Sequence, residues 1–334
     1  MRHTMINVYI LGFDYAFATT IVGVIDLLST AGTAWNFFQG KSMSPKFQVR
    51  LASRDGKPIR CLNNIVLQAD CAFGQIEDAH VVLVPSIGGD VEKTIARNPD
   101  LVDCIRQQAD RGAQLASNCT GAFFLAEAGL LDGRKATTHW AHAERFRKRY
   151  PNVNLIPEQL VTADGPIFCS GGGHSWFDLG LYLIEIYIDH ETAIESAKAM
   201  VIDLGRESQL SYFSLNQNKY HNDEAIKGIQ EWIDQHYAED FSLAWLAEEK
   251  AMSPRTLIRR FKSATGESPL AYLQTVRIEM AKRLLESSKQ TIAEITQNVG
   301  YEDVSSFSKM FKRKVGLSPR EYRGRFSKHV VAGD

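Results

Sequence analysis

Hydrophobic residues in the first two thirds of the chain fall in short runs, separated by segments with helical spacing. Short β-rich runs, such as residues 81–85, are typical of strands. Between them, segments such as residues 99–111 place apolar residues three and four apart, which predicts amphipathic helices. This alternation predicts an α/β sheet layer. Strands are predicted at residues 6–11, 47–52, 81–85, 114–117, 135–138, 160–163 and 167–169, and helices at residues 20–31, 99–111, 121–128, 141–150, 175–188 and 191–204.

The pattern changes near the C-terminus, where residues 242–323 contain an internal repeat. Upstream of the repeated turn the displacement is 49 positions, as from Ser242 to Thr291 and from Leu246 to Ile295. Each copy predicts a short helix, a tight turn and a second helix of about three turns, which is helix-turn-helix geometry. The residues displaced by 50 positions are Phe261, Gly266, Ser268-Pro269 and Tyr272 with Phe311, Gly316, Ser318-Pro319 and Tyr322.

Capping residues set the expected helix ends in both copies. Ser242 can cap residues 243–250, and Ser253-Pro254 gives an N-cap followed by proline at the first helical position. In the second copy Thr291 and Glu294 have capping-box spacing, and Asp303 can cap residues 304–314. The matching stop signals are Gly266 and Gly316, and a helix over residues 269–287 joins the copies.

Charge adds a functional direction to the repeat. The net charge is −1, but residues 251–334 hold 16 Lys and Arg against 8 Asp and Glu, whereas residues 1–250 hold 22 against 31. An ordinary helical domain with a positive surface is the plainer interpretation, but duplication favours DNA, since two linked helices can enter successive major-groove segments. With Leu257, Phe261, Phe307 and Phe311 inside, the outer face is expected to hold Arg255, Arg259, Arg260, Lys262, Lys309, Lys312 and Arg313.

A family resemblance supports the same conclusion. The second copy reads Val299-Gly300-Tyr301-Glu302-Asp303, Phe311-Lys312-Arg313, Gly316-Leu317-Ser318-Pro319 and Tyr322-Arg323. About a third of the chain thereby resembles the DNA-binding domain of AraC/XylS-type transcription regulators. The resemblance implies phosphate contacts for Lys312 and Arg313. It also implies contacts to bases or nearby phosphates for Arg255, Arg259, Ser305, Ser306 and Lys309.

Cys119 is the most suggestive residue of the N-terminal part. It stands where a predicted strand turns sharply into a helix, so its sulfur is expected at a helix N-terminus that favours a thiolate. The amide of Thr120 and an amide from Gly88-Gly89 are expected to bind an anion or a carbonyl oxygen there.

Residues 5–190 resemble the PfpI/ThiJ-like members of the class I glutamine-amidotransferase-like superfamily, through residues 119–122, 132–134 and 137–140. Catalytic relatives often have a histidine after the nucleophile and an acidic residue after the first strand, where this chain has Thr120 and Thr20. Cys119 is therefore interpreted as a pocket wall, with a catalytic nucleophile or plain packing as alternatives. His139 is interpreted as a pocket or core histidine, with a general base as the alternative. The expected effector pocket is Cys119, Thr120, Thr20, Gly88, Gly89 and His139, and weaker candidates are Asp14, Asp178, His174 and Trp176.

Other features limit the class of protein. Five cysteines without a CxxC pair indicate neither a disulfide framework nor a zinc site, and no metal or cofactor is expected. No apolar run reaches membrane-spanning length and the first residues lack a signal-peptide layout, so a cytoplasmic protein is expected.

Together these features predict a ligand-responsive transcription regulator. Residues 1–204 are expected to form an amidotransferase-like α/β sensor, residues 205–222 a linker, and residues 223–328 an all-α domain with two helix-turn-helix modules. Expected partners are promoter DNA, a small metabolite such as an amino acid or small nitrogen compound, a second copy of the chain, and RNA polymerase for an activator. The alternative is an amidase or glyoxalase-type hydrolase that uses Cys119 and is fused to a DNA-binding domain; a pure interaction module has no positive support.

Overall fold

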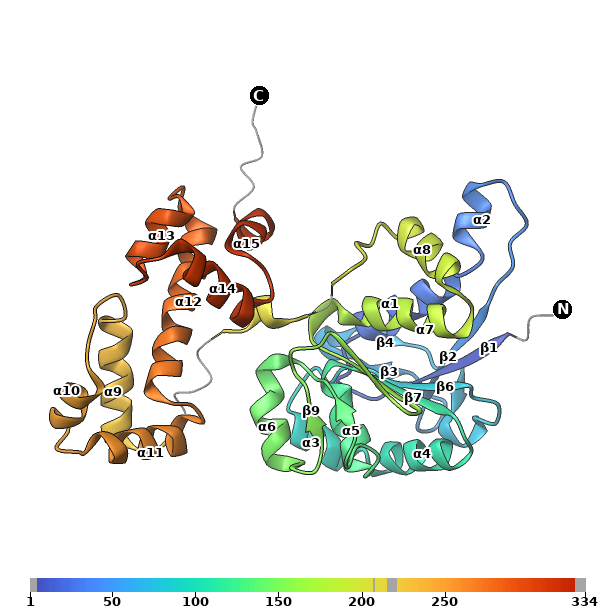
Figure 1. Ribbon diagram of the computed structural model, residues 1–334. Helices are drawn as coiled ribbons and strands as arrows, with labels where there is room; N and C mark the ends of the chain where they lie inside the picture. Colours follow the sequence, from blue (N-terminus) through green and yellow to red (C-terminus); the bar gives the residue numbers. More distant parts are fainter. Residues whose placement is uncertain (1–4, 207, 215–220, 328–334) are drawn as a thin grey trace. The chain divides into compact units, whose positions relative to one another are not determined.

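The computed structural model describes residues 5–206, 208–214 and 221–327 of the chain. The chain divides after Gln209 into two compact units, the α/β unit and the helical unit (Figure 1). The division falls inside the segment 205–222 that the sequence predicts as a linker. Residues 207 and 215–220 of that segment lie outside the described residues.

A mostly parallel sheet forms the centre of the α/β unit. Its strand order is β10-β11-β7-β6-β1-β2-β5, and β10 alone among these strands runs antiparallel to its neighbour. All four residues of β6 and of β11 are buried, because helices cover both faces of the sheet. The strands are β1 (Ile6–Leu11), β2 (Phe47–Ser53), β3 (Ile59–Arg60), β4 (Val66–Leu67), β5 (Cys71–Ala72), β6 (Val81–Val84), β7 (Gln114–Asn118), β8 (Lys135–Ala136), β9 (Asn154–Leu155), β10 (Val161–Asp164) and β11 (Ile167–Ser170).

Helices flank this sheet on its two sides (Figure 1). On one side α1, α7 and α8 pack on one another, and on the other side α3 and α4 pack on α5. Their apolar sides meet the sheet in a single core that includes Leu27, Phe123 and Phe124, all fully buried. The helices are α1 (Thr19–Thr30), α2 (Ala34–Phe38), α3 (Val91–Arg97), α4 (Pro99–Asp110), α5 (Ala122–Glu127), α6 (Ala143–Arg149), α7 (Trp176–Tyr187) and α8 (His190–Ala199).

Most predicted elements of this unit are confirmed to within one or two residues, and two end several residues or half their length earlier than predicted. The strand expected at residues 135–138 ends at Ala136 and pairs only with β9, outside the main sheet. The helix expected at residues 191–204 ends at Ala199, because Val201 takes a left-handed conformation (φ 56°) and the amide of Ile202 folds back to Ala197 O. The sequence interpretation did not include α2, α3, β3, β4, β5 or β9.

The helical unit has the capped helices that its sequence predicts. The hydroxyls of Ser242, Ser253 and Ser268 accept from backbone amides three residues on, and Thr291 forms a complete capping box with Glu294. Gly266 and Gly316 end α11 and α14 in the left-handed region, at φ 81° and 80°. The helices are α9 (Glu224–Gln235), α10 (Leu243–Glu248), α11 (Pro254–Thr265), α12 (Pro269–Ser287), α13 (Ile292–Asn298), α14 (Val304–Val315) and α15 (Pro319–Phe326).

The helical unit is built from two structural copies that share α12. The first half of α12 packs into one core with α9 and α11, and the second half of α12 packs into another core with α13 and α14. The sequence of buried, intermediate and exposed positions over residues 261–270 recurs unchanged over residues 311–320. The duplication also reaches further than the sequence indicated, because the buried residues Ile226, Ile229 and Ile233 of α9 correspond to Ile278, Ala281 and Leu285 of α12, 52 positions later.

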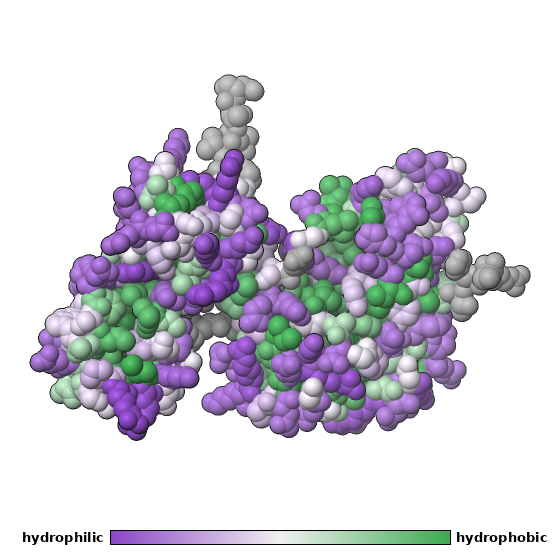
Figure 2. Space-filling view, viewed as in Figure 1, coloured by the Kyte–Doolittle hydropathy of each residue, from purple (hydrophilic) through white to green (hydrophobic). Residues whose placement is uncertain are grey.

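The surface of both units is mainly hydrophilic in the view of Figure 2, with smaller hydrophobic areas between. Within the described ranges, no helix is both long and apolar enough to span a lipid bilayer.

Candidate functional sites

A sharp turn places Cys119 at the carboxyl end of β7. Cys119 has a φ of 54°, a left-handed conformation that is uncommon for a side chain with a Cβ, and a short 3-10 turn then leads into α5. Two residues on, Gly121 lies against the end of β6, where a Cβ would lie 2.5 Å from Val84 O. Only glycine fits this approach, which holds the turn tightly against the sheet.

The turn opens on a pocket of about 420 Å³ in the α/β unit. Its walls contain aromatic rings, hydroxyls and imidazoles but no Asp, Glu, Lys or Arg. Cys119, Thr120, Thr20 and His139, four of the six expected pocket residues, lie together here. The lining residues are Phe17, Thr19, Thr20, Ser86, Ile87, Cys119, Thr120, His139, His142, Gly173, His174 and Trp176.

Two threonine hydroxyls of this pocket are used in structural hydrogen bonds. The Thr20 hydroxyl donates to Phe17 O (2.8 Å) and accepts from the amide of Ser86 (3.1 Å). The Thr120 hydroxyl accepts from the amide of Ile87 (2.9 Å) and lies 3.0 Å from the Ser86 hydroxyl. Both threonines therefore fix the loop after β6, and neither is a proton acceptor for a nucleophile.

The environment of the Cys119 sulfur differs from the expected thiolate site. Burial raises the pKa of the thiol above its ordinary value, although the Ser86 hydroxyl and the amides of Thr120 and Gly173 favour the ionised form. The expectation of a stabilised thiolate is thus wrong, because desolvation outweighs the hydrogen bonds at this buried position.

The second amide at the sulfur comes from Gly173, whereas Gly88 and Gly89 lie outside the pocket lining. The Gly88 amide donates instead to Tyr15 O at 2.7 Å, because the loop after β6 folds back on that residue. Gly173 has a φ of 62° and follows Gly171 and Gly172. This run of three glycines after a predicted strand was the signal in the sequence that could have located the second amide.

His139 lines the pocket as a neutral imidazole. Burial, with a smaller effect from the neighbouring His142, lowers its pKa to about 4. Its Nδ1 accepts from the amide of Ala141 at 3.0 Å, so the proton of the neutral ring is on Nε2. Among the described residues no hydrogen bond joins this ring to Cys119, and the ring packs so closely on Gly172 that a Cβ there would overlap it.

The four weaker candidates separate in the structure. His174 and Trp176 line the pocket, and the Trp176 indole occupies the space that a Cβ at Gly23 would need. Asp14 accepts from the amide of Arg60 (2.8 Å) and Asp178 pairs with Arg206, so both carboxylates have structural roles outside the pocket lining.

The connecting segment enters the wall behind this pocket, which the sequence did not predict. Gln209 is 2% exposed; its amide nitrogen donates to Thr138 O (2.8 Å) and its oxygen accepts from the amide of Gly172 (3.2 Å). The Thr138 hydroxyl in turn donates to Cys119 O at 2.8 Å. A Cβ at Gly171 would lie 2.6 Å from the Gln209 nitrogen. Gln209 therefore contacts the structure that positions Cys119.

Residues 210–213, which follow, belong to the helical unit and contact its helices. The Lys282 ammonium of α12 donates to Phe213 O at 2.6 Å, and the Tyr212 ring meets the Phe326 ring edge-on at 5.5 Å. Most of the Lys282 side chain is buried, where Glu279 also accepts from it (3.0 Å). Both parts of the described connector are thus held by specific contacts.

The second candidate site is the exposed side of α11 and α14 in the helical unit. Leu257 and Phe261 of α11 are buried, as are Phe307 and Phe311 of α14. Among the predicted DNA-binding residues, exposed side chains lie on the opposite sides of these helices. They are Arg255 and Arg259 on α11, and Ser305, Ser306, Lys309, Lys312 and Arg313 on α14.

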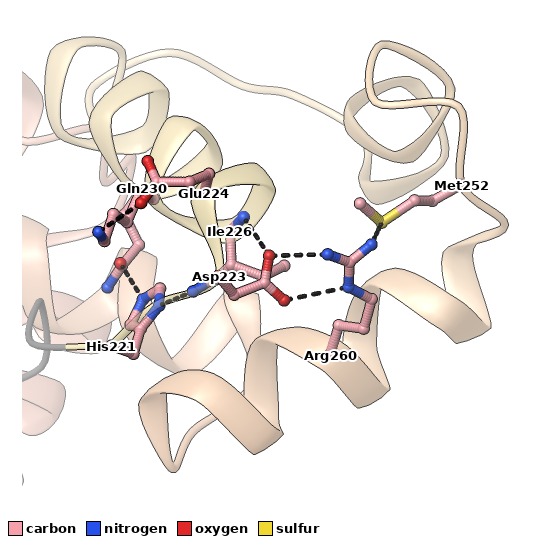
Figure 3. A network of polar contacts seen from close by, with 8 residues as sticks. His221, Asp223, Glu224, Ile226, Gln230, Met252 and Arg260 are labelled. Atoms are coloured by element: carbon pink, nitrogen blue, oxygen red, sulfur yellow. Dashed lines mark hydrogen bonds and ion pairs between the residues drawn. The ribbon is translucent and has the colours of Figure 1, made fainter.

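Arg260 differs from the prediction. Its guanidinium forms a two-pronged ion pair with Asp223, the N-cap of α9, with Nη2 at 2.7 Å from Oδ1 and Nε at 3.1 Å from Oδ2 (Figure 3). The hydrogen bond from Arg260 holds the pKa of the Asp223 carboxyl below its ordinary value. Arg260 therefore joins α11 to α9, and the sequence could not show this because its partner lies 37 residues away.

The turns between the paired helices also correspond, with one chemical difference. Gly300 has a φ of 81°, and at the matching position, 49 residues earlier, Ala251 has a φ of 51°. A Cβ at Gly300 would lie 2.8 Å from both Ala238 O and the Arg277 guanidinium. The second turn thus requires glycine, whereas the first turn holds an alanine in a conformation unfavourable for it.

Comparison with known proteins divides the chain in the same way. The model of the DJ-1/PfpI family matches residues 17–186, and that of a helix-turn-helix domain matches residues 246–325. The HTH-type transcriptional regulator CdhR of Pseudomonas aeruginosa is 28% identical over 279 residues, which are 83% of this chain and 82% of CdhR. The HTH-type transcriptional regulator GbdR of the same species is 25% identical over 81% of this chain and 73% of its own length.

A solved structure agrees with the fold of the α/β unit. The putative transcriptional regulator protein from Vibrio parahaemolyticus matches 58% of this chain and 98% of its own, with a TM-score of 0.51 and 23% identity. This likeness concerns the fold alone.

Proposed function

This chain belongs to the DJ-1/PfpI family and also contains an AraC-type helix-turn-helix domain, and on this premise we propose how it acts as a DNA-binding transcription regulator with a ligand-sensing domain. The helical unit binds double-stranded promoter DNA through α11 and α14. The pocket at Cys119 in the α/β unit binds a small metabolite.

The observation that supports DNA binding most strongly is the exposure of basic side chains on corresponding faces of two duplicated helices. Arg255 and Arg259 on α11, and Lys309 and Lys312 on α14, are exposed opposite the buried side of their helix. In a helix-turn-helix module this face enters the major groove, where arginine can pair with guanine in bidentate fashion. Such contacts displace counterions, so the affinity for DNA falls steeply as salt rises.

The chemistry of the pocket favours an amino acid or a small nitrogen compound. The amides of Thr120 and Gly173 are suited to a carboxylate or a carbonyl oxygen, because they provide donors without a charged side chain. The rings of Phe17 and Trp176 are suited to an ammonium group, which aromatic faces attract. A zwitterion would engage both kinds of group without a charged side chain in the wall.

We infer that Cys119 lines this pocket and is not a nucleophile. A buried neutral thiol without a hydrogen-bonded base is weakly nucleophilic, and the pKa of His139 is too low for an effective base near neutral pH. The alternative is an amidase or glyoxalase-type hydrolase. Intact-mass spectrometry with candidate amides and dicarbonyls separates the two: we expect no adduct, and a trapped acyl-enzyme that disappears in Cys119→Ser would establish the hydrolase.

The remaining expectations concern assembly and location. We infer a cytoplasmic homodimer, because a second copy would add two further modules for adjacent half-sites and raise affinity through effective concentration. RNA polymerase is a partner if the protein is an activator. Sedimentation of the full chain with and without DNA tests the dimer.

One experiment tests both halves of the proposal. The full chain is used to select duplexes from a randomised pool, and binding of the selected duplex is measured across a salt series. Thermal shift of the same protein with amino acids and quaternary amines then tests the pocket, since a ligand of the folded state raises the unfolding temperature. Failure to enrich any sequence would contradict the DNA-binding role, and no shift with any compound would contradict the effector class.

A further inference from the structure

An apolar residue lies among the exposed basic residues of α11, the second helix of the first helix-turn-helix module. Ile258 of α11 is 39% exposed. Its neighbour Leu257 is buried in the core, whereas its other neighbour, Arg259, is exposed on the basic side of the helix. On a helix Ile258 shares one side with Arg255 and Lys262, which are three residues before it and four after it. The same three residues, with Arg259, line one shallow groove on α11.

The second module has a polar residue at the equivalent position. The position equivalent to Ile258 is Ser308 of α14, 50 residues later, and the positions equivalent to Arg255 and Arg259 are Ser305 and Lys309. The duplicated scaffold therefore tolerates a small polar residue at this place. Packing within the module does not explain the isoleucine, because its side chain stays accessible in the folded helical unit.

A positively charged groove that contains one apolar side chain is suited to a negatively charged surface that also presents an apolar group. The major groove of DNA presents phosphates for the cations, and the thymine C5 methyl is the apolar group on its base edges. We propose that Ile258 contacts a thymine methyl and so makes the first module select thymine beside the bases read by Arg255 and Arg259. This inference rests on the proposed DNA-binding function, and it assigns a base preference to Ile258, which is not among the predicted DNA-binding residues.

The charge around Ile258 favours DNA over a protein as the occupant. The groove is lined by Arg255, Arg259 and Lys262 and by no acidic residue, so a partner must supply negative charge around an apolar contact. DNA supplies that charge on both sides of every base step.

Replacement of thymine by uracil removes the C5 methyl and leaves the Watson–Crick groups unchanged. The probe is the duplex selected by the full chain, together with copies in which each dT is replaced in turn by dU. Loss of one methyl-sized contact is expected to weaken binding about fourfold at one or two positions. In parallel, binding of the parent and of Arg259→Ala to duplexes with single base-pair substitutions identifies the base pairs that Arg259 contacts. The thymines that are sensitive to replacement by dU are expected next to these base pairs.

The variants assign this sensitivity to Ile258. Ile258→Ala is expected to bind dT and dU duplexes equally, Ile258→Val to keep part of the preference, and the matched change Ser308→Ala in the second module to keep all of it. Because Ile258 is exposed, circular dichroism is expected to show each variant folded.

The outcomes are distinct. If the parent tolerates dU at every position, or if Ile258→Ala keeps the parent's sensitivity, the thymine contact is wrong while DNA binding stands. If Ile258→Ala leaves DNA binding intact but disrupts self-association of the chain, the groove is a protein interface. If the full chain enriches no sequence, the proposed function fails and this inference with it.

Discussion

The guanidinium of Arg277 in α12 donates to the carbonyl oxygen of Gly300 at 2.7 Å, across the turn of the second module. The same group donates to Tyr237 O (2.7 Å) and Glu239 O (3.1 Å), just after α9, and lies over the Tyr301 ring. One largely buried side chain thus joins the end of the first module's α9 to the turn of the second.

Removal of this side chain is expected to loosen both segments. Arg277→Ala leaves three carbonyl groups without their charged donor, a loss of roughly 2–4 kcal/mol in the unfolding free energy of the helical unit. Arg277→Lys keeps the charge but not the planar fork, so an intermediate loss is expected. Urea unfolding followed by circular dichroism measures both; equal stability of all three proteins would mean that these contacts contribute little.

Both turns are expected to favour glycine. Gly300→Val is expected to abolish DNA binding, because its Cβ would overlap Ala238 O and φ is positive. Ala251→Gly relieves an alanine in the left-handed region, with a gain of up to about 1 kcal/mol after the entropic cost of glycine. Thermal unfolding and DNA affinity of the two variants test this directly, and Gly300→Ala is the milder matched control. A stabilised Gly300→Ala would contradict the assignment of the turn.

DNA-contact residues are expected to differ in kind. Arg259→Ala should lose about 1–3 kcal/mol of discrimination at one or two base pairs, whereas Lys312→Ala should weaken binding to all sequences and reduce the salt slope by about one. Arg260→Ala is the structural control. It removes the ion pair with Asp223 and is expected to lower the unfolding free energy by up to about 1 kcal/mol, without a change in base preference. Binding to duplex variants by fluorescence anisotropy measures all three, and an altered preference in Arg260→Ala alone would reverse the assignment.

Protonation of His139 should make the α/β unit less stable in mild acid. Its folded pKa of about 4 lies below the ordinary value of 6.5, so the unfolded chain binds the proton first as pH falls. Stability is therefore full above pH 6.5 and declines towards pH 4, by about 3 kcal/mol over the window. His139→Gln should flatten this part of the profile. Parallel profiles for the parent and His139→Gln would mean that His139 binds a proton equally well in the folded and the unfolded chain.

Gln209 should stabilise the α/β unit although it lies in the connector. Gln209→Ala leaves Thr138 O and the Gly172 amide without partners, at a cost of roughly 1–3 kcal/mol in unfolding free energy. Ser208→Ala, which removes one surface hydrogen bond to Glu158 O, is the neighbouring control and should change little. Urea unfolding distinguishes them. A fragment for ligand screening should accordingly extend through residue 209, and a fully stable fragment ending at residue 205 would contradict this role.

Local signals explain why much of the fold was predictable. Ser253-Pro254, Asp303 and the paired glycines Gly266 and Gly316 act within a few residues of the backbone they cap, so the sequence alone located those helix ends. The turn at Cys119 followed in the same way from a strand next to a glycine-containing helix start.

Contacts between distant segments account for what was missed. The partner of Arg260 is 37 residues away, and Gln209 meets Thr138 across 71 residues without any periodic signal in the connector. The protonation of Cys119 depended on burial by several elements together, which a local argument from the helix N-terminus cannot include. The positions of Gly88 and Gly173 likewise depended on how two loops fold back on the sheet.

Because both modules share α12, this helix also sets the distance between them. The first half of α12 contributes Tyr272, Leu273 and Val276 to the first core, and its second half contributes Ile278, Ala281 and Leu285 to the second core. One continuous helix therefore fixes the separation of α11 and α14. One inserted base pair rotates a half-site by roughly 35° about the DNA axis, and no hinge within the helix compensates for that rotation. Substitutions on α11 or α14 can therefore change which bases are recognised, but the distance between the two recognised segments is expected to stay constant, and operators lengthened by one base pair should be bound by one module only.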